Sequence, residues 1–320
     1  MTQFVVFGLV ELFAPLVLIL WLFVGRPDSR AAWLLRVLLT AGLIGVAAVA
    51  GLWLLVPWTM VYLDVLLFVA AAWISWRRVM SRRWRPSKRT ASVAESVLTG
   101  LSAAAMLAVL SFALAGHRRP TGVAIDLSFP LHGGRYYIAN GGSNVLINQH
   151  LRTERVDGGA FRGQSYGVDI VEVSSLGLRA HGLLPADPSR YLIFGARVYA
   201  PCRGRVIGAA DTYPDLRVPQ TDDKHPIGNY ILLRCADYEV LLAHLERGSV
   251  RVSPGDHVTP DEPALARVGN SGNSIEPHLH IHAQQPASGA ALMSAAPVPM
   301  LFDGNFLVRN QTIQFDRAGH

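Results

Sequence analysis

Residues 269–283, with the sequence GNSGNSIEPHLHIHA, join a turn rich in Gly, Asn and Ser to a strand-like stretch that carries His278 and His280. Side chains at positions i and i+2 of a β-strand point to the same face, so both imidazoles are expected to reach one site. Neutral imidazole is the commonest metal ligand and also an acid or base near neutral pH. An isolated pair of this kind also fits a solvated strand, so a metal site requires partners elsewhere in the chain.

Two such partners occur in the same half of the chain. Asp169 lies inside the apolar, β-branched run GVDIVEV at 167–173, where a carboxylate needs a reason to be buried. His244 ends another strand-like run, YEVLLAHL at 238–245. These runs predict that a carboxylate and a third imidazole join the His278/His280 pair.

In chain order, the motifs that accompany these residues are GVDI at 167–170, GARVYAP at 195–201, GNYI at 228–231, AHL at 243–245 and the histidine pair. This order resembles the LytM or lysostaphin-type zinc endopeptidases, which cut peptidoglycan peptides, over residues 130–285. The resemblance implies that Asp169 and His280 bind zinc, and that His244 and His278 are catalytic histidines beside the metal-bound water. It also implies a mainly β, antiparallel domain with the duplicated hybrid motif of that family.

The chain departs from the family pattern at one position. The family usually has a histidine four residues before the aspartate, and this chain has Ser165 there. We expect His150 to supply the missing zinc ligand, with Glu154 as a weaker substitute. His181 and His225 are expected in surface loops. His257 and His282 are expected to point away from the site, although His282 shares the strand face of the pair.

Three protein ligands leave zinc a further position for a water of lowered pKa, which is the arrangement of hydrolytic zinc sites. The chain has no HExxH sequence, so no helix-borne glutamate base is expected. Two other classes stay open. Ser165 favours a catalytically inactive relative that binds cell wall or activates a hydrolase. A lipoyl-type carrier is disfavoured, because Lys224, the only lysine after residue 116, lies outside a suitable hairpin.

Residues 1–116 differ in composition from the rest of the chain, because they contain several long apolar stretches. Long apolar stretches predict four transmembrane helices at 4–24, about 34–56, 58–76 and 93–115, because about 20 apolar residues span a bilayer. The first stretch lacks a preceding basic region and is too long for a cleaved signal peptide. We therefore expect a membrane domain at 1–116 and an exported zinc-peptidase-like β domain at 117–320.

Basic residues predict the orientation and exclude one class of partner. The segment 77–89 contains seven Lys or Arg and no acid, which places it in the cytoplasm and residues 117–320 outside it. Residues 1–116 hold 10 of the 29 basic and 4 of the 23 acidic residues, so 19 of each sign remain and the exported part is neutral. The expected partners are therefore the lipid bilayer and peptidoglycan peptides, without nucleic acid. A regulatory protein partner stays open, and the expected location is the inner membrane of a bacterium.

The chain has two cysteines, Cys202 and Cys235, both in the exported part. A hairpin register with Val206 opposite Ile231 would also place the cysteines opposite each other. A disulfide is therefore expected in an oxidising compartment, with two buried free thiols as the alternative.

Overall fold

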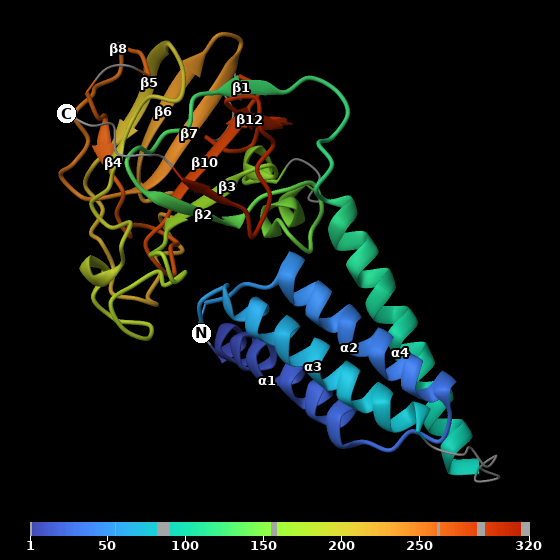
Figure 1. Ribbon diagram of the computed structural model, residues 1–320. Coiled ribbons are helices and arrows are strands. Elements are labelled where there is room, and N and C mark those ends of the chain that lie inside the picture. Colours follow the sequence, from blue (N-terminus) through green and yellow to red (C-terminus); the bar gives the residue numbers. More distant parts are fainter. Residues whose placement is uncertain are drawn as a thin grey trace. The chain divides into compact units, whose positions relative to one another are not determined.

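The computed structural model describes residues 2–54, 56–81, 90–154, 159–260, 263–286 and 292–314. The chain divides into two compact units, Met1–Ala115 and Gly116–His320. The first unit is helical and the second is built on a β-sheet (Figure 1). Most of the basic segment that predicts the orientation, 82–89, lies outside the described residues.

Four helices form the first unit: α1 (Thr2–Val24), α2 (Arg30–Ala50), α3 (Met60–Met80) and α4 (Thr90–Ala115). Three stretches within the described residues are long and apolar enough to cross a membrane, namely Arg30–Ala50, Met60–Met80 and Val93–Ala115. In α1 the corresponding apolar stretch is the shorter Gly8–Val24. The structure thus supports three spanning helices by length and composition, and a fourth span stays a prediction.

The second helix is shorter than the apolar run predicted. It ends at Ala50 rather than near residue 56, and the next helix begins only at Met60. The carboxylate of Glu11 accepts hydrogen bonds from the backbone N–H groups of Leu52 (2.6 Å) and Trp53 (3.0 Å) in this connection. Glu11 therefore binds backbone N–H groups of the segment that follows the helix.

The second unit contains a nine-stranded sheet, in which all strand pairs are antiparallel. Its order is β13-β2-β3-β10-β7-β6-β5-β8, and β11 pairs with β10. The strands of this sheet are β2 (Arg135–Asn140), β3 (Val168–Glu172), β5 (Gly204–Ala210), β6 (Asn229–Cys235), β7 (Tyr238–Leu245), β8 (His257–Val258), β10 (Leu279–Gln284), β11 (Pro297–Val298) and β13 (Thr312–Gln314). An antiparallel β domain is confirmed, while the duplicated hybrid motif stays a prediction.

Short elements complete this unit. They are the parallel pair β1 (Ile125–Leu127) and β12 (Met300–Phe302), the antiparallel pair β4 (Arg197–Val198) and β9 (Ala266–Arg267), and the 3-10 turns η1 (Gln149–Thr153), η2 (Arg162–Gln164) and η3 (Pro188–Arg190).

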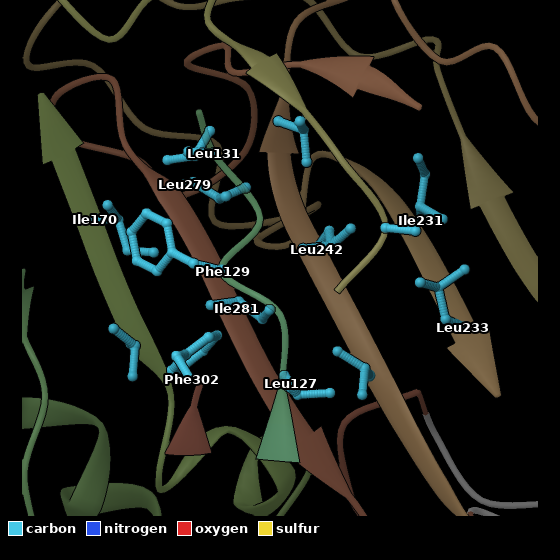
Figure 2. Close-up of a cluster of buried hydrophobic side chains, with 14 of the residues drawn as sticks. Leu127, Phe129, Leu131, Ile170, Ile231, Leu233, Leu242, Leu279, Ile281 and Phe302 are labelled. Atoms are coloured by element: carbon cyan, nitrogen blue, oxygen red, sulfur yellow. The ribbon is translucent and has the colours of Figure 1, made fainter. Parts of the chain in front are cut away.

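The main core lies against one face of the sheet. Figure 2 shows Phe129 and its neighbours lying over Ile170 of β3, Ile281 of β10 and Leu242 of β7. Because side chains alternate along a strand, the residues between these core positions point to the other face. Asp169 and His280 are such residues, so the core fixes the strands that carry them.

Irregular strand pairing interrupts this alternation at three positions in the sheet. The register shifts in β2 between Ile138 and Asn140, and in β7 opposite the step from Asn229 to Tyr230. Each shift leaves one extra residue, Ala139 in β2 and His244 in β7, so the next side chains change face. A third shift lies in β5 between Val206 and Gly208.

The structure contains the Cys202–Cys235 disulfide, with the two Cα atoms 5.9 Å apart. The predicted register was wrong by two residues, because Val206 pairs with Leu233 and not with Ile231. The bond still forms because β5 begins only at Gly204, so Cys202 lies before the paired strand.

Candidate metal centre

Asp169 and His280 form the middle of the site. They are direct partners in the antiparallel pair of β3 and β10, the neighbouring strands visible in Figure 1. Directly opposed residues point to the same face, and Nδ1 of His280 lies 2.8 Å from Oδ1 of Asp169. Both residues are buried, with 7% of Asp169 and 3% of His280 exposed.

His150 joins them from the 3-10 turn η1. The Asn148 side chain caps this turn by accepting a hydrogen bond from the His150 backbone N–H at 3.1 Å. Nε2 of His150 then lies 2.9 Å from Oδ2 of Asp169. The approach requires Gly167, because a Cβ atom there would come within 2.8 Å of the His280 ring and 3.3 Å of the His150 ring.

The three side chains offer ligand atoms that all lie within 4.8 Å of one another. Burial lowers the pKa of His280 to about 4, so this imidazole is neutral at physiological pH. Burial alone would raise the pKa of Asp169, but His150 and His278 outweigh it and hold that pKa well below its usual range. A carboxylate and neutral imidazole have the protonation states that a metal ion requires of its ligands.

His244 reaches the same face through the bulge in β7. Strict alternation from Leu242 would place it on the core face, but its φ of +60° breaks the alternation. Its Nδ1 donates to the carbonyl oxygen of Ser271 at 2.9 Å, and its ring centroid lies 4.7 Å from that of His278. Burial lowers the pKa of His244 well below its usual value, so its Nε2 carries a lone pair at neutral pH.

His278 lies just before β10 and is oriented by the turn that precedes it. Its Nδ1 is 2.8 Å from the carbonyl oxygen of Glu276 and 3.1 Å from Oγ of Ser274. A carbonyl only accepts, so Nδ1 carries the proton and Nε2 is the basic nitrogen. That Nε2 lies 3.7 Å from Oδ1 of Asp169, which directs it into the site.

The loop at 173–192 also supports this turn. The buried Arg179 forms an ion pair with Glu276, whose backbone carbonyl orients His278, and its guanidinium lies 5.1 Å from the ring centroid of Tyr137. The loop is therefore tied to the site by a buried charge pair.

The prediction that His282 points away from the site is wrong. Its side chain is fully buried, and its Nδ1 lies 2.9 Å from Nε2 of His280. It therefore holds the second nitrogen of a candidate ligand, as partners outside the ligand set commonly do. The signal was present in the sequence, since 278, 280 and 282 share one strand face.

Ser165 is buried but belongs to the local scaffold. Its hydroxyl donates to the carbonyl of Arg162 at 2.7 Å and lies 3.1 Å from the hydroxyl of Thr153. The Thr153 hydroxyl in turn donates to the carbonyl of His150 at 2.7 Å. Ser165 thus links η2 to η1, the turn that carries His150.

The remaining candidates lie apart from this group. Glu154 is exposed at the end of η1. His181 and His225 are exposed, as predicted, and His257 is exposed and lies outside the group. His225 pairs with Asp222 at 2.9 Å.

Sequence reasoning missed Asn140. Its Nδ2 donates to Oδ2 of Asp169 at 2.7 Å, because the bulge at Ala139 turns Asn140 to the face of Asp169. An asparagine near the end of a strand gives no signal of this role by itself.

Residues 192–292 match the family model described as Peptidase family M23. The match confirms the resemblance to LytM and lysostaphin-type peptidases, and its range includes His244, His278 and His280. It begins after His150 and Asp169, so it does not reach the other half of the candidate ligand group.

Several solved structures are similar at low identity. The protein of "Identification and structural characterization of LytU" is 19% identical, over 38% of this chain and 81% of that chain, with a TM-score of 0.24. The catalytic domain of the antimicrobial peptidase lysostaphin from Staphylococcus simulans is 19% identical, over 37% and 84%, with a TM-score of 0.19. Csd3 from Helicobacter pylori is 14% identical, over 55% of this chain and 33% of that chain, with a TM-score of 0.28. No curated protein shows significant similarity.

Proposed function

We propose that this protein is a membrane-anchored zinc metalloendopeptidase that hydrolyses peptide bonds in peptidoglycan stem peptides or cross-bridges. The observation that carries the proposal is the convergence of His150, Asp169 and His280, with His244 and His278 tethered beside them. The match of 192–292 to peptidase family M23 supports the reaction class. The substrate class rests on the resemblance of the motifs to peptidoglycan endopeptidases.

The donor set fits zinc. Two imidazoles and one carboxylate are common zinc ligands, and catalytic zinc sites typically have three protein ligands. A bound zinc ion would lower the pKa of a coordinated water and polarise the peptide carbonyl. His150, Asp169 and His280 would hold the ion, and Gly167 leaves the room that their approach requires.

His244 and His278 supply the acid–base chemistry in this proposal. In each ring Nδ1 is bonded to a backbone carbonyl, which leaves Nε2 to accept a proton from the attacking water. Once protonated, the same nitrogen can donate to the developing oxyanion or to the leaving amine. Backbone anchoring on the 269–276 turn fixes both tautomers and limits rotation of both rings.

An extracytoplasmic position of the catalytic domain completes the proposal. Apolar helices long enough to cross a membrane support anchoring. The seven basic residues of segment 77–89 favour a cytoplasmic location for that segment. The Cys202–Cys235 disulfide favours an oxidising compartment for the second unit. A bacterial inner membrane with the domain on its outer side agrees with both features.

The test combines metal content and hydrolysis. The full chain, purified in detergent, is expected to bind one zinc ion and to release peptides from purified sacculi in a chelator-sensitive way. Asp169→Asn should lose both zinc and activity, because it removes the ligand group's only charge. Zinc-loaded protein that binds sacculi but releases nothing would instead favour the non-catalytic cell-wall-binding relative.

A further inference from the structure

The segment after the family match contributes a buried cation to the ligand side of the site. Arg309 is only 3% exposed, although it lies in the last part of the described chain. Its position is fixed by β13, which pairs with β2 in the register Thr312↔Tyr137. The backbone N–H of Asn310 also donates to the carbonyl of Ile138 at 3.0 Å. The C-terminal segment is therefore part of the sheet that bears Asp169.

The Arg309 guanidinium holds the bulge in β2. It donates from Nε to the carbonyl of Ala139 at 2.9 Å, from Nη1 to the carbonyl of Leu146 at 3.1 Å, and from Nη2 to Oδ1 of Asn140. Ala139 is the extra residue that the ladder of β2 and β3 leaves without a cross-strand partner. The partly buried carbonyl of Ala139 at this bulge needs a donor from elsewhere, and Arg309 supplies it.

Asn140 passes this order on to Asp169. Arginine has only donors, so it must face the oxygen of the Asn140 amide. The amide nitrogen is thereby turned toward Asp169, and donates to Oδ2 at 2.7 Å. The same carboxylate oxygen lies 2.9 Å from Nε2 of His150. Arg309 thus selects the amide orientation that aims one candidate ligand.

The same pair also supports the segment that carries His150. Leu146, whose carbonyl accepts from Arg309, lies four residues before His150. The backbone N–H of Gln149, next to His150, is 3.4 Å from Oδ1 of Asn140. Arg309 and Asn140 therefore contact the segment that carries His150, and Asn140 also contacts Asp169.

We propose that Arg309 and Asn140 are positioning residues of the metal centre, so that the C-terminal segment outside the family match is required for tight zinc binding. The inference rests on the proposed zinc site. Substitution of residues that orient metal ligands from outside the ligand set commonly weakens metal affinity by about 10–100-fold. Arg309 acts here through Asn140 and through the backbone carbonyls of Ala139 and Leu146, and not by contact with metal or substrate.

The test measures zinc affinity of the full chain in detergent by competition with a chromophoric chelator. Arg309→Met and Asn140→Leu are each expected to weaken zinc binding by about 10–100-fold. Arg135→Gln is the matched control, because it removes an exposed contact of 2.9 Å between β2 and Gln314 of β13 that does not reach the site. It should bind zinc like the wild type.

A double variant separates positioning from general damage. Because Arg309 and Asn140 share one hydrogen bond, combining Arg309→Met with Asn140→Leu should weaken zinc binding by less than the product of the two single effects. Independent, multiplying effects would contradict the proposal, as would wild-type affinity in either single variant. If Arg309→Met fails to fold, Arg309→Lys with Asn140→Leu carries the same comparison. A wild-type chain that binds no zinc would overturn the proposed function itself.

Discussion

Asp169 and His280 lie directly opposite each other on β3 and β10, with Oδ1 of Asp169 2.8 Å from Nδ1 of His280. The pairing joins two residues that are 111 positions apart in the sequence. Register in an antiparallel sheet is specified by the buried face, here Ile170, Leu279 and Ile281. The hydrophobic core on one face thus determines the geometry of the candidate metal centre on the other.

Metal binding and activity are expected to separate at His244 and His278. Replacing either with alanine should leave zinc content near that of the wild type, because neither belongs to the ligand group. Hydrolysis of peptidoglycan peptides should fall by about a hundredfold or more, the scale of one acid–base or oxyanion group. Zinc analysis and initial rates on the same preparations check this. Loss of zinc in either variant would move that histidine into the ligand set.

Ser165 and His150 should behave differently on substitution. His150→Ala should remove a ligand and abolish stoichiometric zinc binding. Ser165→Ala should keep zinc, because the hydroxyl bonds to Arg162 and Thr153, and should cost about 1 kcal/mol of stability. Zinc content and thermal unfolding of both variants provide the measurement. The assignment of His150 would be contradicted by full zinc content after its removal.

Acidification should destabilise the metal-free β domain. Burial lowers the pKa of His280 to about 4 and the pKa values of His244 and His282 well below the usual value near 6.5. Between pH 6.5 and about 4 the unfolded chain therefore binds protons that the folded one does not, so stability falls as the pH falls. Each such group costs at most about 1.4 kcal/mol per pH unit in this window.

Calorimetry of the full chain in detergent with chelator can follow this loss. The transition of the β domain is the one lowered by Leu242→Ala, which should cost about 2–5 kcal/mol in the core. A midpoint for that transition that stays constant from pH 7 to 4.5 would contradict the protonation states assigned to the three histidines.

The disulfide links stability to location. It joins residues separated by 33 positions, and replacing both cysteines with alanine should cost about 3–4 kcal/mol in the chain-entropy account. In protein taken from cells without reductant, neither Cys202 nor Cys235 should react with an alkylating reagent. Two alkylated thiols would argue against an oxidising compartment. In a separate test, a reporter protein that works only in the cytoplasm is fused at residue 200, and its activity there would contradict the proposed topology.

Among the candidate residues, Asp169 and His280 lie on regular strands and could be found from alternation in the sequence. His150 and His244, which lie on a 3-10 turn and at a bulge, were indicated by the family resemblance. Asp169 and the His278/His280 pair follow from period-two alternation, and the core strands follow from their β-branched runs. The helices of the first unit follow from apolar length, although the end of α2 at Ala50 did not, because the apolar run continues without a break.

What escaped sequence reasoning depends on departures from regular pairing. The bulges at Ala139 and His244 change which face the following side chains use. The pairing of Val206 with Leu233 differs by two residues from the predicted register, and the bulge in β5 adds one more residue beyond it. Asn140 and Arg309 are 169 positions apart and meet only because β13 adds to β2. Such contacts are set by the fold and leave no local pattern.

The most direct test of the central claim is the chemistry of the products that the zinc-loaded full chain releases from purified sacculi. We expect new free amino groups at defined peptide positions, no new reducing sugar ends, and loss of the products with chelator or with His280→Ala. New reducing ends, or release that persists in chelator and in His280→Ala, would contradict a zinc peptidase centred on Asp169 and His280.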